Sequence, residues 1–131
     1  LKEKINLFIS TSFEDVSISY MEYLGRKGQL HGIYYPIQNL VIDKSELGRS
    51  IEIDGIARDG HSLLVIECKF TKEKRSIRDF GRMKENTSIK MFSAIKHFEY
   101  YIISKNGFDD SLLKAKQDNL HLITLDDMFR I

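Results

Sequence analysis

Residues 63–70 constrain the fold most, because they read LLVIECKF and are apolar on both faces of a strand except at Glu67 and Lys69. Successive side chains of a strand point to opposite faces, so a strand that is apolar on both faces is covered on both sides of its sheet. Ionised side chains in such a strand need partners or a ligand. The segment therefore predicts a buried strand of an α/β sheet that carries a polar site.

A hairpin is predicted here, because residues 50–57 form a second strand-like segment and an Asp-Gly pair at 59–60 connects it to the first. An Asp-Gly pair between two such segments is a strong hairpin signal. If these two residues are the centre of the turn, Glu52 lies opposite Glu67. Asp54 is then diagonal to Glu67, with Cβ atoms roughly 7 Å apart.

This register places Glu52, Asp54, Glu67 and Lys69 on one face of the hairpin. Carboxylates on such a diagonal can converge on one hard cation, which also removes their mutual repulsion. The alternative is a simple Glu67–Lys69 ion pair at a solvated strand end. We favour the metal site, because Asp54 on the neighbouring strand completes a set that an ion pair does not require. Cys68 alternates with Glu67 and Lys69, so its side chain is expected to point away as a small buried hydrophobe.

The remaining sequence predicts a mixed sheet flanked by helices. Phe13, Val16, Tyr20 and Leu24 recur at three- and four-residue steps, which is typical of one buried helix face. This first helix is predicted to run from a capping box at 11–14 to glycines 25 and 28, and an edge strand at 33–42, interrupted by Pro36, and a connection at 44–50 follow it. After the hairpin, the sequence predicts a helix at 76–95 that is broken near 85–88 and a strand at 98–104. The last predicted elements are a helix from Asp109 or Asp110 to about Gln117, a strand at 120–125 and a closing helix from Asp126. Late strands separated by a helix predict parallel pairing and helices on both faces.

The composition of the chain excludes several classes of protein. The 131 residues suit a single domain, the 42% hydrophobic content is enough for a core, and a start other than Met indicates a piece of a longer protein. One cysteine excludes a disulfide framework or a multi-cysteine zinc site and fits a cytoplasmic location, and no apolar run reaches the roughly 20 residues of a membrane span. The four histidines have no zinc-ligand spacing.

The net charge is only +1, yet residues 69–84 hold seven basic and two acidic residues. This basic segment suggests either a solvated helix face or an edge of the protein that follows the phosphates of a nucleic acid.

Asp54 followed by Glu67-Cys68-Lys69 resembles the metal-binding motif of the PD-(D/E)XK nucleases, with Ile53 in place of the proline that names the family. Residues 49–57 are similar to the C-terminal nuclease-like domain of archaeal-type ATPases, to Mrr-type restriction endonucleases and to Holliday junction resolvases. The resemblance implies a restriction-endonuclease-like αβββαβ core. It covers most of the chain from Phe13 onward.

The resemblance also implies a reaction, which is metal-dependent hydrolysis of DNA phosphodiester bonds, with a homodimer as one way to reach both strands. Asp54, Glu67 and the Cys68 carbonyl would hold Mg²⁺ or Mn²⁺, with Glu52 nearby through water. The ion would polarise the phosphoryl oxygen, and Lys69 would orient the attacking water or neutralise developing charge.

Two points stay open at this stage. Such nucleases often carry a further acid on the first helix, and both Glu14 and Glu22 are candidates, although Glu14 also suits the capping box. The alternative function is a DNA-binding or regulatory nuclease-like domain, appended to an ATPase and with little cleavage of its own.

Overall fold

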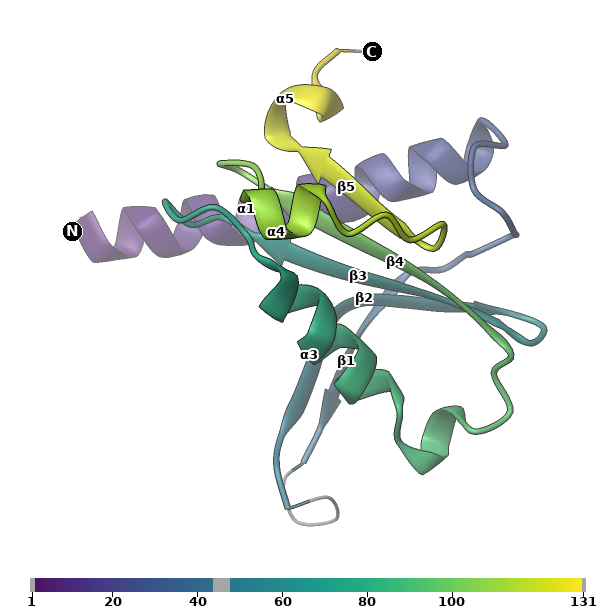
Figure 1. Ribbon diagram of the computed structural model, residues 1–131. Coiled ribbons are helices and arrows are strands. Elements are labelled where there is room, and N and C mark those ends of the chain that lie inside the picture. Colours follow the sequence, from purple (N-terminus) through teal and green to yellow (C-terminus); the bar gives the residue numbers. More distant parts are fainter. Residues whose placement is uncertain (1, 44–47, 131) are drawn as a thin grey trace.

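The computed structural model describes residues 2–43 and 48–130, which form a mixed five-stranded sheet with helices on both faces (Figure 1). The elements are α1 (Lys2–Arg26), β1 (Gln38–Ile42), β2 (Ile51–Asp59), β3 (Ser62–Lys69), α3 (Ile77–Thr87), the 3₁₀ helix η1 (Lys90–Phe92), β4 (His97–Ser104), α4 (Asp110–Leu113), β5 (Leu120–Thr124) and α5 (Leu125–Met128). The strand order is β1-β2-β3-β4-β5. The first two pairings are antiparallel, and the last two are parallel, as predicted.

Strand β3 is the central strand and is covered on both faces, which confirms the expectation from its sequence. Leu64 and Ile66 belong to a core cluster packed beneath α1. Leu63 and Val65 belong to a second cluster, beneath α3 and α4. Figure 1 shows α1 on one side of the sheet and α3 with α4 on the other. The two clusters pack the sheet between helices on both faces.

The hairpin turn lies one residue later than predicted. Asp59 pairs with Ser62, so Gly60 and His61 are the central residues, and Gly60 has φ +61°. Glycine with positive φ in the first central position is the requirement of a type II′ turn, which matches the twist of the flanking strands. The predicted pairing of Glu52 with Glu67 was therefore wrong, and the last regular pair before the site is Gly55 with Ile66.

Strand β2 contains a β-bulge that the sequence did not reveal. Residues 54–55 of β2 lie opposite the single β1 residue Asn39, because Gln38 pairs with Ile56 and Leu40 pairs with Ile53. An extra residue reverses the alternation of side chains. Accordingly, Ile53 belongs to the core beneath α3 while Ala57 belongs to the core beneath α1.

Gly55 makes close packing possible at the bulge. A Cβ built on Gly55 would lie 2.7 Å from Cδ1 of Ile18 on α1 and 3.1 Å from Cδ1 of Ile66 on β3. Only glycine lets the helix and the strand approach this closely. Asp54 is the other residue of the bulge, where a bend can redirect a side chain.

Helix α1 differs from the prediction at its start and along its buried face. It begins at Lys2 and runs through residues 11–14, so the predicted helix start at a capping box was wrong. Phe13 and Leu24 are buried as expected, but Val16 is 41% exposed. Ser17 and Met21 occupy the buried face instead, and the Ser17 hydroxyl donates to the Phe13 carbonyl at 2.7 Å.

The remaining boundaries are close to the predicted ones. The edge strand β1 starts only at Gln38, after Pro36, and the predicted helix at 76–95 breaks after Thr87 as expected. Helix α4 starts after the cap Asp109 but ends at Leu113, short of the predicted end. Of the predicted connection at 44–50, residues 44–47 lie outside the described residues. Among the helices that the structure describes, none is both long and apolar enough to cross a membrane.

Candidate functional site

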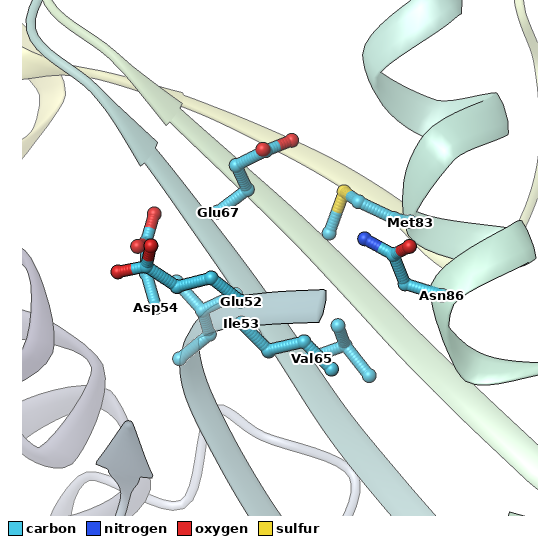
Figure 2. A pocket seen from close by; sticks show the side chains of 8 residues that line it. Glu52, Ile53, Asp54, Val65, Glu67, Met83 and Asn86 are labelled. Carbon is cyan, nitrogen blue, oxygen red and sulfur yellow. The ribbon is translucent and has the colours of Figure 1, made fainter. Parts of the chain in front are cut away.

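A polar cavity of about 290 Å³ lies where β2 and β3 separate beyond their last regular pair. Its lining side chains combine three carboxylates and three cations with two neutral polar groups. They are Glu52, Asp54, Glu67, Arg49, Lys69, Arg82, Ser50 and Asn86. Figure 2 shows Glu52 and Asp54 of β2 and Glu67 of β3 around an adjoining small hollow, with Met83 and Asn86 of α3 on its other side. We call the larger space the carboxylate cavity.

Asp54 is fixed by the backbone of β3. Its Oδ2 accepts a hydrogen bond from the Cys68 N–H at 2.9 Å, in place of a ladder bond between the strands. Burial raises the pKa of Asp54, and the Cys68 hydrogen bond and the Lys69 charge only partly oppose this effect. The carboxylate is therefore held in position while its charge is incompletely compensated.

Glu67 is buried more deeply and is only half satisfied. Its Oε1 lies 3.4 Å from Lys69 Nζ and 3.6 Å from Arg82 Nη1. Its Oε2 is buried and has no hydrogen-bond partner among the described residues. Burial raises the pKa of Glu67, with Lys69 acting against this and Asp79 adding to it. A buried carboxylate oxygen without a partner is costly and calls for a cation.

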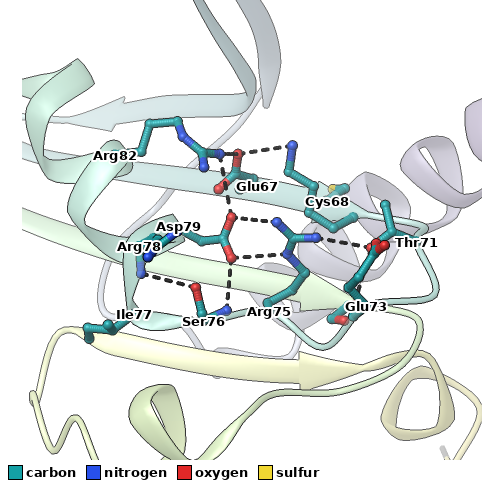
Figure 3. Close-up of polar contacts among 12 residues, drawn as sticks. Glu67, Cys68, Thr71, Glu73, Arg75, Ser76, Ile77, Arg78, Asp79 and Arg82 are labelled. Atoms are coloured by element: carbon teal, nitrogen blue, oxygen red, sulfur yellow. Dashed lines mark hydrogen bonds and ion pairs between the residues drawn. The ribbon is translucent and has the colours of Figure 1, made fainter.

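A buried ion-pair network supports Glu67 from the side of α3 (Figure 3). Arg75 donates two hydrogen bonds to Asp79, at 2.8 and 3.0 Å, and the Ser76 N–H donates a third at 3.0 Å. Burial alone would raise the pKa of Asp79, but these bonds outweigh it and the pKa lies below its usual value. Arg82 Nη1 lies 3.4 Å from Asp79 Oδ1, so it bridges this anchor to Glu67.

Helix α1 contributes Glu14 to the same region. Burial raises the pKa of Glu14, followed by the negative charges of Asp54 and Glu52. Glu22 lies eight residues further along α1, or about 12 Å, and lines a different pocket. Of the two candidates, Glu14 is therefore the one beside the carboxylates. Among the three carboxylates of the cavity, Glu52 is the exposed one.

The side chain of Cys68 points away from the cavity, as predicted, and packs against the core beneath α1. Burial raises the pKa of its thiol, and the neighbouring Asp54 charge adds to the effect. A neutral buried thiol is a poor nucleophile. The backbone carbonyl of Cys68, in contrast, faces the same side as the N–H that binds Asp54, as strand geometry requires.

The donors in the cavity suit a hard metal ion with a small protein ligand set. Within residues 2–43 and 48–130, no group of three or more His, Cys, Asp or Glu side chains is arranged to hold a metal ion. Mg²⁺ needs fewer protein side chains than three, because it binds through one or two carboxylates and keeps several waters. The oxygen donors of the cavity that could supply such a set are the Glu67 Oε2 without a partner, the Asp54 carboxylate and the Cys68 carbonyl.

A second polar cluster surrounds Glu99 of β4, which is only 3% exposed. Its Oε1 is 2.8 Å from His31 Nδ1 and 3.1 Å from His97 Nε2, and its Oε2 is 2.8 Å from His121 Nε2. Burial acts to raise the pKa of Glu99, but the histidine contacts prevail and lower it. Sequence reasoning missed this cluster because the histidines come from three distant segments. The one available signal was a lone Glu within the apolar strand at 98–104.

Comparisons of the chain with protein-family models, with curated proteins and with solved structures find no match. Any function must therefore be argued from the carboxylate cavity itself.

Proposed function

We propose that the chain is a metal-dependent DNA endonuclease domain of the PD-(D/E)XK type, with Mg²⁺ or Mn²⁺ held by Asp54, Glu67 and the Cys68 carbonyl. The observation that carries the proposal is the buried Glu67 Oε2, which has no partner among the described residues and lies in the same cavity as Asp54. Burial raises the pKa values of both Asp54 and Glu67, and a divalent cation would offset the negative charge of both carboxylates. The mixed sheet with helices on both faces is compatible with a restriction-endonuclease-like core.

Each residue has a task that its position allows. Asp54 and Glu67 would hold the ion from two adjacent strands. The Cys68 N–H keeps the Asp54 carboxylate in place, and Arg82 contacts the Glu67 carboxylate. When bound, the ion polarises a phosphoryl oxygen and lowers the pKa of a water. Lys69, 31% exposed, lines the same cavity and neutralises charge that develops on the phosphate. Glu14, whose pKa is raised by burial and by the charges of Asp54 and Glu52, would serve as a further proton acceptor.

A second candidate is a nuclease-like DNA-binding or regulatory domain with weak cleavage, attached to an ATPase. It is favoured by one specific observation, which is that Lys69 and Arg82 already contact Glu67 Oε1 and so compete with an ion. The two candidates differ in cleavage rather than in DNA binding.

The test is cleavage of plasmid, single-stranded and branched DNA with Mg²⁺ or Mn²⁺. We expect wild-type protein to cut at least one substrate and Glu67→Ala to be slower by at least about 100-fold, because the ion loses a ligand. Glu73→Ala is the matched control, since Glu73 is an exposed acid in the loop before α3 and does not line the cavity. Equal cutting by wild type and Glu67→Ala would contradict the proposal. Persistent DNA binding without any cutting would favour the second candidate.

A further inference from the structure

The carboxylate cavity also has a cationic side. Its three carboxylates are balanced by three cations, Arg49, Lys69 and Arg82. Lys69 already has a role beside Glu67. A divalent ion bound to the carboxylates would leave the cavity with a net charge of +2, which attracts an anion. The two arginines are therefore the groups available to a phosphate.

Arg49 and Arg82 are aligned along α3. Arg49 Nη1 donates to Asn86 Oδ1 at 2.9 Å, and Arg49 Nη2 donates to the Glu85 carbonyl at 3.3 Å. Asn86 lies four residues after Arg82, so the two side chains share one face of the helix about 6 Å apart along its axis. The two guanidinium groups thus form a row beside the carboxylates, which we call the arginine row.

Both members of the arginine row are partly exposed to solvent. Their side chains are 40% and 49% exposed. Arg82 contacts Glu67 and Asp79 through Nη1, and no contact of its Nε or Nη2 is found among the described residues. The Arg49–Glu85 pair, at 3.5 Å, is exposed on both sides and is therefore weak. The two Arg82 contacts, at 3.4 and 3.6 Å, use only Nη1, which leaves Nε and Nη2 for a phosphate that guanidinium groups bind in a bidentate manner.

We propose that Arg49 and Arg82 bind two phosphate groups of one polynucleotide strand and so position the strand over Asp54 and Glu67. The proposal rests on the proposed function for its substrate, but it is tested by binding and not by cleavage. It makes the arginines positioning residues. It also makes Arg49, which lies outside the basic segment 69–84, part of the DNA-binding surface.

The experiment measures the affinity for a fluorescent single-stranded oligonucleotide in Ca²⁺ over a series of salt concentrations. We expect Arg49→Gln and Arg82→Gln each to weaken binding about tenfold and to reduce the slope of log affinity against log salt by about 1. Arg82→Lys should keep the slope, because it keeps the charge. Arg26→Gln, an exposed arginine at the end of α1 outside the cavity, should leave both quantities unchanged.

The arginine row would be overturned if the slope of log affinity against log salt were the same for Arg49→Gln and Arg82→Gln as for Arg26→Gln. It would also be overturned if the wild-type protein did not bind the oligonucleotide. Circular dichroism confirms that each variant is folded, and the Arg82→Lys variant repeats the comparison without loss of charge. The outcome is independent of the nuclease proposal. A reduced slope without cutting by wild type would reject the nuclease and keep the arginine row.

Discussion

Glu67→Gln is expected to raise the melting temperature of the domain while it removes metal-dependent cleavage. Burial raises the pKa of Glu67 in the folded chain, so its ionised form is destabilised relative to the unfolded chain. Glutamine removes that charge and keeps a similar shape. It also removes a metal ligand, so cleavage falls by at least about 100-fold. Stability gained at the expense of activity is typical of a functional site.

The sign of the pH dependence follows from the raised pKa. Above that pKa, the folded wild-type protein carries the unfavourable charge, and Glu67→Gln has its full advantage. As the pH falls through the raised pKa, the wild-type carboxylate is protonated in the folded state, and the advantage shrinks. Below the ordinary value of 4.5 the advantage is gone.

Calorimetry of wild type, Glu67→Gln and the control Glu73→Gln at neutral and acidic pH tests this prediction. A change of 1 kcal/mol corresponds to roughly 2–8 °C for a domain of this size, which is readily resolved. A lower melting temperature for Glu67→Gln at neutral pH would mean that Lys69 and Arg82 already compensate Glu67 fully. In that case Glu67 would be a structural ion-pair residue.

Asp79→Ala is expected to destabilise the domain by about 3–5 kcal/mol, because it removes one partner of a buried ion pair. Asp79 is 1% exposed and accepts hydrogen bonds from Arg75 and from the Ser76 N–H of the α3 capping box. Its loss leaves the Arg75 guanidinium, 17% exposed, without its carboxylate and removes a helix cap. Arg82 also loses the contact that anchors it near Glu67.

Urea unfolding of Asp79→Ala, Asp79→Asn and the double variant Arg75→Ala/Asp79→Ala measures this network. Asparagine keeps an acceptor oxygen, so it should cost less than alanine. The double variant should cost less than the sum of the single ones, because the pair is lost only once. Additive effects, or a loss below about 1 kcal/mol for Asp79→Ala, would show that the network contributes little.

The sheet and its central strand could be predicted because residues 63–70 are apolar on both faces and admit few other structures. The order of the helices and strands and the two strands of the hairpin were also predicted correctly. The predicted position of the turn was wrong by one residue. Gly60 can serve in either central position of a two-residue turn, and only the pairing of the flanking residues decides which position it takes. The predicted pairing of Glu52 with Glu67 depended on this exact register and failed with it.

Other features depend on contacts between distant segments. The bulge at residues 54–55 exists because β1 pairs with β2 in two registers, which no local pattern encodes. Helix α1 continues through a sequence that matches a capping box, so local capping preference did not set its start. The histidines around Glu99 meet only because β4 and β5 pair side by side and the loop after α1 covers them.

Titration with Mn²⁺ by isothermal calorimetry tests most directly whether Asp54 and Glu67 hold a metal ion. We expect one ion per chain in wild-type protein, and no measurable binding in Asp54→Asn or Glu67→Gln. The Asp54→Asn variant keeps an oxygen that can accept the Cys68 N–H bond, so it separates loss of charge from loss of structure. Glu99→Gln, which alters the histidine cluster instead, should bind like wild type. Unchanged binding in the two cavity variants, or no binding in wild type, would contradict the metal site.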